Sequence, residues 1–206
     1  MNIAVFCSGN GTNFQAIVDS CKKGLINADV ALMVCDNQDA YALKRAKEEN
    51  IKTLLLSVKD FSSKDVFEAR IIEELEKEKI ELICLAGYMR ILGKYFVERY
   101  RNRIINIHPA LLPSFKGNKA IDEAWDYGVK LTGITIHFVN EDMDAGPIIL
   151  QEPIKIEEND TRQTLEEKIH NLEHKLYPEA IRLFIKGNLS IAGRRVMLSK
   201  LEGFQK

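Results

Sequence analysis

The chain has 206 residues, of which 46% are hydrophobic and 29% are charged, and its formal net charge is −1. This length and composition are typical of one sizeable soluble globular domain. The near-neutral charge argues against nonspecific nucleic-acid binding, which needs a basic face, and no apolar run approaches the roughly 20 residues that span a membrane.

The N-terminus and the cysteines indicate the compartment. Residues 1–6 enter an apolar run directly, with no basic segment of the kind that opens a signal peptide. The four cysteines lack metal-ligand spacing, and three of them lie in strand-like apolar runs. Such cysteines are typical of small buried side chains in a reducing compartment. We therefore expect a cytoplasmic protein.

A glycine-rich loop follows the first predicted strand. The strand is the short apolar run at residues 3–7, and Ser-Gly-Asn-Gly-Thr-Asn separates it from apolar residues at helical spacing. Thr12 and Gln15 fit a capping box at the start of that helix. Glycines let the backbone approach an anion, and the helix N-terminus directs free N–H groups at it. The loop is a candidate phosphate site, with a plain tight turn as the alternative.

Strands and helices then alternate. Apolar runs at residues 28–35, 52–56, 81–86 and 104–107 predict strands, and Ser62 or Ser63 is a candidate cap for one of the helices between them. Such alternation predicts a parallel sheet with helices on both faces. Ligands bind these sheets at the carboxyl ends of the strands. The glycine loop, residues 89–90 and residues 106–108 lie at such ends, so we expect them to converge.

Asn106 and His108 close the fifth predicted strand. Their spacing puts both side chains on one face of an extended chain, about 6.5–7 Å apart. Pro109 and Pro113 follow, and neither can continue a central strand. An amide beside an imidazole at a stiff turn is a candidate catalytic site, and a strand end with a satisfied histidine is the alternative.

The pattern changes after a short predicted helix at residues 121–127. Residues 131–139 and 148–156 read as two strands joined by an acidic loop, so we expect an antiparallel pair. His137 shares a face with Thr135 and is interpreted as structural. Asp144 in the loop would raise the pKa of His108 if the two meet, although acidic residues before Gly-Pro are commonly turn formers.

A long helix follows, capped by Asp160 or Thr161 and ended by Gly187, and the tail to Lys206 is expected to be weakly structured. Together these elements predict an α/β, three-layer, Rossmann-like fold. Its sheet is mainly parallel, with an antiparallel portion from the C-terminal strands. We expect residues 1–206 to form a single domain.

Two motifs suggest other chemistry. The first two glycines of the loop, with Asp36 at the end of the next strand, resemble part of a dinucleotide site, but Phe14 stands in place of the third glycine. The stretch from His170 to His174 matches the H-x-x-E-H pattern of some zinc peptidases. Because only three positions are fixed, exposed polar residues are the favoured interpretation, and we expect no metal.

Three separated stretches resemble the phosphoribosylglycinamide formyltransferase family. They are S-G-N-G-T-N at residues 8–13, N-I-H-P-A-L-L-P-S-F-K-G at residues 106–117, and G-I-T-I-H-F-V with D-M-D-A-G-P-I-I-L-Q within residues 133–151. The Asn-x-His-Pro core is shared by the wider folate-dependent formyltransferase and deformylase superfamily. Within that superfamily, the glycine loop favours the phosphoribosylglycinamide formyltransferases. Methionyl-tRNA formyltransferase and formyltetrahydrofolate deformylase each carry an additional domain, for which a chain of this length is expected to have no room.

The resemblance implies a reaction. An enzyme of this family transfers the formyl group of 10-formyltetrahydrofolate to the amine of 5-phosphoribosylglycinamide (GAR), giving formyl-GAR in de novo purine biosynthesis. The formyl donor is a cosubstrate, and no metal is expected. The implied partners are these two small molecules, with no nucleic acid or membrane, and the expected assembly is a monomer or weak homodimer.

The resemblance also implies roles for individual residues. The catalytic residues would be Asn106, His108 and Asp144. The GAR site would comprise Gly11, Thr12, Asn13, His170 and Glu173. The folate site would comprise Lys64, Met89, Arg90, Ile91, Leu92, Asn106, Asn140, Glu141, Asp142, Met143 and Asp144. Ile121 lies where the family is expected to have a histidine.

Overall fold

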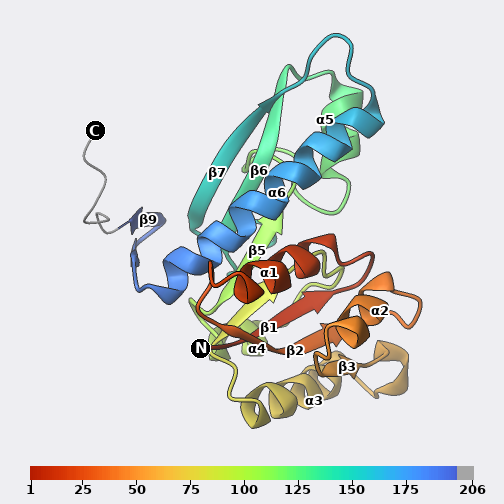
Figure 1. The fold of residues 1–206 in the computed structure, drawn as a ribbon, viewed down its shortest axis with the longest axis vertical. Helices are drawn as coiled ribbons and strands as arrows, with labels where there is room; N and C mark the ends of the chain where they lie inside the picture. The colour runs from red at the N-terminus through yellow and green to blue at the C-terminus, as the bar shows by residue number, and fades with distance from the viewer. Residues whose placement is uncertain (199–206) are drawn as a thin grey trace.

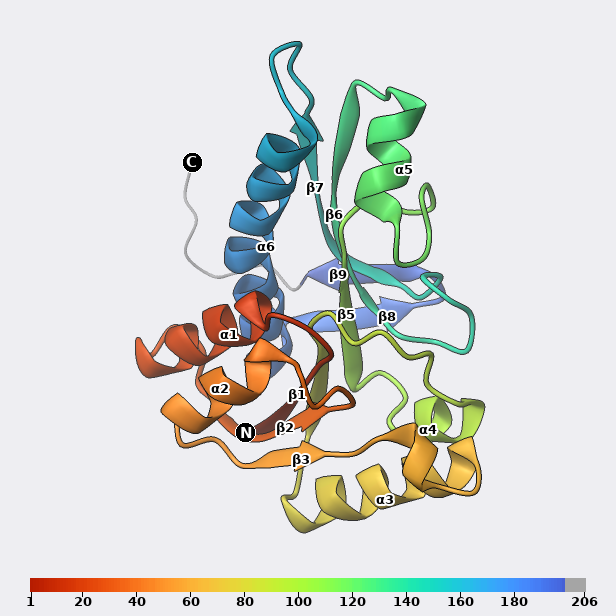
Figure 2. The same cartoon turned by 90° about the vertical axis from the view of Figure 1, so that its right-hand side faces the viewer.

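A computed structural model describes residues 1–198, which form a mixed sheet with helices on both faces (Figures 1 and 2). The strand order is β3-β2-β1-β4-β5-β6-β7-β9-β8. The strands are β1 (Asn2–Cys7), β2 (Asp29–Cys35), β3 (Thr53–Leu55), β4 (Leu82–Leu85), β5 (Ile104–His108), β6 (Leu131–Phe138), β7 (Ile148–Lys155), β8 (Leu189–Ala192) and β9 (Arg195–Leu198). The helices are α1 (Thr12–Lys22), α2 (Tyr41–Glu48), the 3₁₀ turn η1 (Val58–Asp60), α3 (Lys64–Lys77), α4 (Lys94–Arg99), α5 (Ala120–Tyr127) and α6 (Arg162–Ile185).

The first five strands form the parallel part of the sheet, as the alternating pattern predicts. One hydrophobic cluster lies between the sheet and α1, α2 and α6, with Phe14 and Tyr177 fully buried in it. A second cluster lies on the opposite face under α3 and α4 and includes Phe67 and Phe96. The two clusters confirm the three-layer α/β fold.

The antiparallel portion begins at β5. Strand β6 pairs antiparallel with β5, and β7 pairs antiparallel with β6, as expected for the two later strands. The register places Asn106 opposite His137 and His108 opposite Thr135. Strand β5 therefore has a parallel neighbour, β4, on one side and an antiparallel neighbour, β6, on the other. Its polar C-terminal end lies where the parallel part of the sheet meets the antiparallel part.

The segment after α6 corrects the expectation of a weakly structured tail. Residues 189–198 form an antiparallel hairpin of β8 and β9, and β9 meets β7 in parallel through Ile148 and Arg195. Leu189, Ile191 and Val196 pack against the first cluster, because alternate residues of the hairpin are apolar. The part of the tail at residues 199–206 lies outside the described residues.

Other local expectations are confirmed. Ser63 caps α3 by accepting a hydrogen bond from the Val66 N–H, and Thr161 caps α6 in a capping box with Thr164. Three of the four cysteines are buried in strands, and Cys21 is half-buried on α1. Within residues 1–198, no helix is both long enough and apolar enough to cross a membrane.

Candidate active site

A cavity of about 650 Å³ lies where the carboxyl ends of the parallel strands meet the antiparallel portion. Every predicted site residue lines it except Lys64. The predicted lining residues are Gly11, Thr12, Asn13, Met89, Arg90, Ile91, Leu92, Asn106, His108, Asn140, Glu141, Asp142, Met143, Asp144, His170 and Glu173. The expected convergence of the strand ends is therefore present.

The glycine loop leaves the start of α1 open. Gly11 is the N-cap residue, with φ of 76°, and no side chain caps the helix. A Cβ atom on Gly11 would lie 2.7 Å from the Ala42 Cβ, so the close approach of α2 requires glycine here. The predicted capping box between Thr12 and Gln15 is wrong. The Gln15 side-chain amide instead donates hydrogen bonds to Asp19 on α1 and to Glu49 at the C-terminal end of α2. The first-turn N–H groups thus remain available for an anion.

Helix α6 brings a histidine–carboxylate pair to this loop. The buried Glu173 carboxylate accepts a hydrogen bond from the Asn13 amide at 2.9 Å, and the same oxygen lies 2.9 Å from His170 Nδ1. The hydrogen bond with Glu173 raises the pKa of His170, against the opposing effect of burial. This side of the cavity therefore favours a cationic imidazole next to an open helix N-terminus.

A second polar cluster joins β5, β6 and the loop before β7. Asp144 Oδ2 lies 3.5 Å from His108 Nδ1, and Asp144 Oδ1 lies 3.6 Å from His137 Nε2. The Gly117 N–H donates to Asp144 Oδ2 at 2.8 Å, and Asn106 Nδ2 lies 3.2 Å from His137 Nε2. Asp144, which is far from Asn106 and His108 in sequence, is thus brought beside them at the end of β5.

Backbone carbonyls fix protons on both rings of this cluster. His137 Nδ1 lies 2.8 Å from the Phe138 carbonyl oxygen, and His108 Nε2 lies 2.7 Å from the Phe115 carbonyl oxygen. A carbonyl can only accept, so each of these nitrogens carries a proton. His137 Nε2 is then free to accept from the Asn106 amide, and His108 Nδ1 faces Asp144.

Burial dominates the electrostatics of His108. Burial lowers the pKa of His108, and the nearby Asp144 carboxylate offsets only part of that effect. The expected effect of Asp144, which raises the pKa of His108, is therefore confirmed, but burial outweighs it and makes the net shift a lowering. For Asp144, burial would raise the pKa, but its contact with His137, the hydrogen bond from the Gly117 N–H and the charge of His108 lower it overall. Asp144 is therefore an anion that faces a histidine poised to gain or lose a proton.

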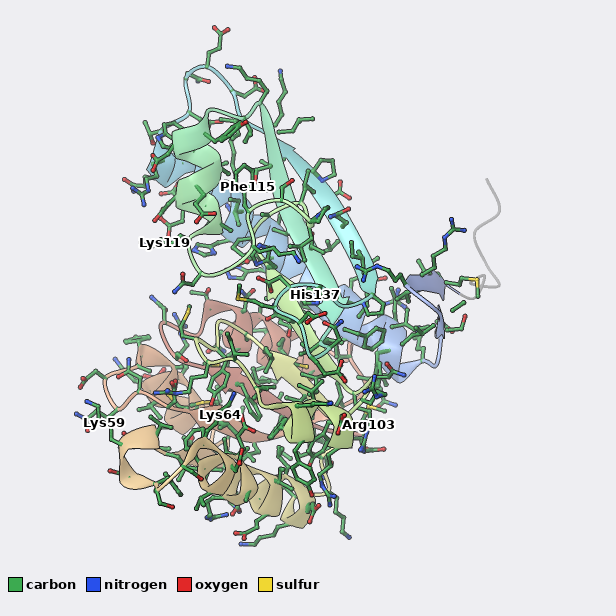
Figure 3. All side chains as sticks on the ribbon, turned by 180° about the vertical axis from the view of Figure 1, so that it is seen from behind. Lys59, Lys64, Arg103, Phe115, Lys119 and His137 are labelled. Atoms are coloured by element: carbon green, nitrogen blue, oxygen red, sulfur yellow. The ribbon has the colours of Figure 1, made fainter. Side chains whose placement is uncertain are left out.

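His137 is a site residue that the sequence-based interpretation missed. Its ring is buried, yet it lines the cavity and contacts both Asn106 and Asp144. Figure 3 shows it where the β6–β7 arm meets the rest of the sheet, with Phe115 on the loop above. The available signals were its place in an alternating strand and in the stretch G-I-T-I-H-F-V that carries the family resemblance. The pairing register that puts it opposite Asn106 is a tertiary property.

The wall formed by residues 87–92 is apolar at its rim. Met89 and Ile91 are both more than 60% exposed, and Met143 faces the same cavity from the acidic loop. Exposed apolar side chains around a cavity are suited to a flat organic ligand. Arg90 also lines this wall, although its side chain forms an ion pair with Asp36.

Two other residues with assigned expectations lie outside the cavity lining. Lys64 opens α3 and lies 3.8 Å from the Glu68 carboxylate. Figure 3 shows Lys64 well separated from His137. Ile121 packs against the first hydrophobic cluster, which accounts for an apolar residue at that position.

The two alternative motifs receive no support from the geometry. Both carboxylate oxygens of Asp36 are engaged, one by the Ser8 hydroxyl and one by Arg90, so Asp36 does not face the cavity as a ribose-binding acid would. His170 and His174 stack on α6 with ring centroids 6.4 Å apart. Within residues 1–198, no group of three or more His, Cys, Asp or Glu residues is arranged to hold a metal ion.

Comparison with known proteins gives a consistent result. Residues 1–181 match the family model described as Formyl transferase. The chain is 49% identical to the phosphoribosylglycinamide formyltransferase of Bacillus subtilis over 179 residues, which are 87% of this chain and 92% of that protein. It is 40% identical to the trifunctional purine biosynthetic protein adenosine-3 of Gallus gallus, over 93% of this chain but 19% of that longer protein.

A solved structure with a similar fold gives the same family assignment. The glycinamide ribonucleotide transformylase 1 of Symbiobacterium toebii superimposes with a TM-score of 0.94 at 44% identity. The superposition covers 97% of this chain and 94% of that one.

Proposed function

Since the chain belongs to the formyl transferase family, we propose that it transfers the formyl group of 10-formyltetrahydrofolate to the amine of GAR. The observation that carries this proposal is one cavity that joins an open helix N-terminus to the Asn106–His108–Asp144 cluster. The first suits a phosphate and the second suits acyl-group chemistry. The product is formyl-GAR, an intermediate of de novo purine biosynthesis.

The polar cluster supplies what formyl transfer demands. As the amine attacks the formyl carbon, negative charge develops on the formyl oxygen and needs hydrogen-bond donors in a site with little water. The Asn106 amide and His108, once protonated, are donors at the end of β5. Asp144 stabilises the imidazolium because it is an anion 3.5 Å from His108 Nδ1.

Two proton transfers accompany the reaction. The attacking nitrogen loses a proton and the folate nitrogen gains one when its bond to the formyl carbon breaks, so the net proton count does not change. Because burial lowers the pKa of His108, its protonated ring gives up a proton more readily than an ordinary histidine does, which suits a proton donor to the folate nitrogen. We assign this acid–base role to His108, with Asp144 as the fixed countercharge.

The acceptor GAR is proposed to bind along α1 and α6. Its phosphate is assigned to the loop of Gly11, Thr12 and Asn13, where the uncapped helix offers N–H groups. The raised pKa of His170 favours a cation that attracts the same phosphate. Glu173 is a hydrogen-bond acceptor suited to ribose hydroxyls, and Asn13 and His170 hold its carboxylate in place.

The formyl donor is proposed to bind between residues 89–92 and residues 140–144. Exposed Met89, Ile91 and Met143 form an apolar rim that fits a flat pterin. Backbone groups on both segments can pair with the polar edge of the ring. Lys64 lies outside the cavity lining, so any role for it would be with the distal glutamate tail of the folate.

Further proposals concern the whole chain. We propose that residues 1–206 form one domain, that it acts in the cytoplasm as a monomer or weak homodimer, and that it needs no metal. These proposals rest on the family resemblance and on the continuous sheet through residues 1–198.

The function is tested with purified protein and 10-formyltetrahydrofolate, with and without GAR, and again with a chelator. We expect loss of formyl-folate only in the presence of GAR, and no effect of the chelator. Loss without GAR would make the protein a deformylase, and no loss in either case would contradict formyl transfer altogether. The His108→Ala variant is the matched control, because it removes the acid–base group while leaving the glycine loop unchanged.

A further inference from the structure

Asp36 is a buried carboxylate to which the proposed reaction gives no role. It follows β2, its side chain is 7% exposed, and it does not line the cavity. A buried anion is costly unless it is paired and hydrogen-bonded. Both of its oxygens are used, since Oδ1 accepts from the Ser8 hydroxyl at 2.5 Å and Oδ2 lies 2.6 Å from Arg90 Nε.

Both partners of Asp36 lead to the wall of the cavity on the formyl-donor side. The Ser8 oxygen accepts a hydrogen bond from the Met89 backbone N–H at 2.9 Å. Arg90 is the next residue along the chain, and its guanidinium lies 5.9 Å from the centre of the Phe67 ring. Met89 and Arg90 line the cavity, so Asp36 contacts this wall through two independent connections.

The charge of Asp36 fixes the direction of the two hydrogen bonds that the Ser8 hydroxyl makes. A serine hydroxyl has one proton, and donating it to Asp36 leaves the oxygen lone pairs to accept from Met89. The charge of the carboxylate makes the hydrogen bond from Ser8 shorter and stronger than a neutral one, and the same charge forms the ion pair with Arg90. An alanine at position 36 would free the serine proton to rotate and would release the arginine side chain.

We propose that Asp36 is a positioning residue for the formyl donor: through Ser8 and Arg90 it holds the Met89–Arg90 backbone in the conformation that binds the folate ring. This inference rests on the proposed function. The inference predicts different effects on the two substrates. The contacts of Asp36 lead to the side of the cavity assigned to the formyl donor, whereas Glu173 and His170 lie on the side assigned to GAR. Loss of Asp36 is therefore expected to weaken folate binding selectively.

The test compares Asp36→Ala, Asp36→Asn and a control, Asp39→Ala. Asp39 lies on the same loop and is exposed, so its replacement removes the same charge without touching the wall. For each protein, the KM for 10-formyltetrahydrofolate, the KM for GAR and kcat are measured. Calorimetry with tetrahydrofolate gives the affinity for the folate without any turnover.

Asp36→Ala is expected to raise the KM for 10-formyltetrahydrofolate and the Kd for tetrahydrofolate about tenfold, a loss of about 1.4 kcal/mol. The KM for GAR and kcat should stay within about twofold. Asp36→Asn retains one acceptor oxygen and should recover part of the affinity, because it can still accept from Ser8 but cannot form the ion pair with Arg90. Asp39→Ala should match the wild type.

Several results would overturn the proposal. They are an unchanged folate affinity in Asp36→Ala, an equal loss for both substrates, or the same loss in Asp39→Ala. If Asp36→Ala does not fold, Ser8→Ala replaces it; this variant keeps the Arg90 ion pair and should weaken tetrahydrofolate binding about threefold, and unchanged binding would contradict the inference. Wild-type protein that binds tetrahydrofolate but does not formylate GAR would refute the proposed function alone, while wild-type protein that binds no folate would refute both.

Discussion

Two histidine–carboxylate pairs line the same cavity, and their histidines have opposite pKa shifts. His108 is buried and lies 3.5 Å from Asp144, and its pKa is lowered. His170 is 42% exposed in its side chain and lies 2.9 Å from Glu173, and its pKa is raised. The pairs have the same chemistry, so the difference comes from their surroundings.

The comparison shows how burial and contact distance compete. A carboxylate at hydrogen-bond distance stabilises an imidazolium that still meets solvent, whereas a more distant carboxylate does not compensate for complete burial. The lowered pKa of His108 and the raised pKa of His170 suit different functions in the cavity. A buried histidine whose charged form is disfavoured can take up and release a proton during the reaction, and a histidine whose charged form is favoured can hold a phosphate.

The largest expected effect comes from removing the buried histidine. His108→Ala should lower kcat by about 10²–10⁴-fold, the usual contribution of a positioned acid–base group. Both KM values should change little, because His108 is assigned to the reacting atoms and not to binding. Steady-state kinetics on protein with a native circular dichroism spectrum check this. A kcat within threefold of the wild type would remove His108 from the mechanism.

Asp144→Asn tests the partner of that histidine. The amide oxygen can still accept from the Gly117 N–H, so the loop should remain in place, while the charge that raises the His108 pKa is lost. The pH at which kcat/KM declines on the basic side should move lower, because the imidazolium loses the carboxylate that stabilises it. The rate at pH 7 should fall roughly tenfold, a typical cost of losing a contact with a charged group. A pH–rate profile that keeps its position would show that Asp144 does not act through His108.

Glu173→Gln tests the half-exposed pair in the same way. Loss of the anion should lower the His170 pKa, so the KM for GAR should rise about tenfold, a typical value for a lost charge-assisted contact. The rise should be larger at pH 8 than at pH 6, because the lower pH favours protonated His170 in both proteins. In His170→Lys the cation persists without Glu173, so this variant should keep the KM for GAR nearly independent of pH between 6 and 8. An increase in the KM for folate instead would contradict the assignment of this pair to the acceptor.

The smallest expected effect is on stability. The folded pKa of His108 is below the unfolded value, so the unfolded chain binds more protons and stability falls as the pH drops through about 6.5. The folded pKa of His170 is above that value, so its contribution is fully present below about pH 6.5 and is lost as the pH rises through the folded pKa.

Denaturant unfolding between pH 5 and pH 8 separates the two histidines. His108→Gln should make the protein less sensitive to acid, and His170→Gln should make it more sensitive, by less than about 1 kcal/mol because the pair is half exposed. The same direction of change in both variants would show that the pairs do not differ as their pKa shifts indicate.

Much of this site follows from local patterns in the sequence. The glycine loop and residues 89–90 and 106–108 each end a predicted strand, and parallel strands bring such ends to one edge. Their convergence on one cavity was therefore predictable. The C-terminal hairpin was missed because β8 and β9 are short, and they gain their stability from packing on β7 and the first cluster.

The sequence by itself determined the order of the strands and helices as far as α6, the places where α3 and α6 begin, and the residue types at the strand ends, because each depends on local periodicity or on neighbours in the chain. Only the tertiary structure decided which side chains meet. The register of β5 and β6 put His137 beside Asn106, and the packing of three segments put Asp36 in contact with Ser8 and Arg90 beside Met89. The tertiary structure also decided the pKa shifts of the two histidines. These shifts depend on burial and on contacts between residues that are far apart in sequence, which no local pattern encodes.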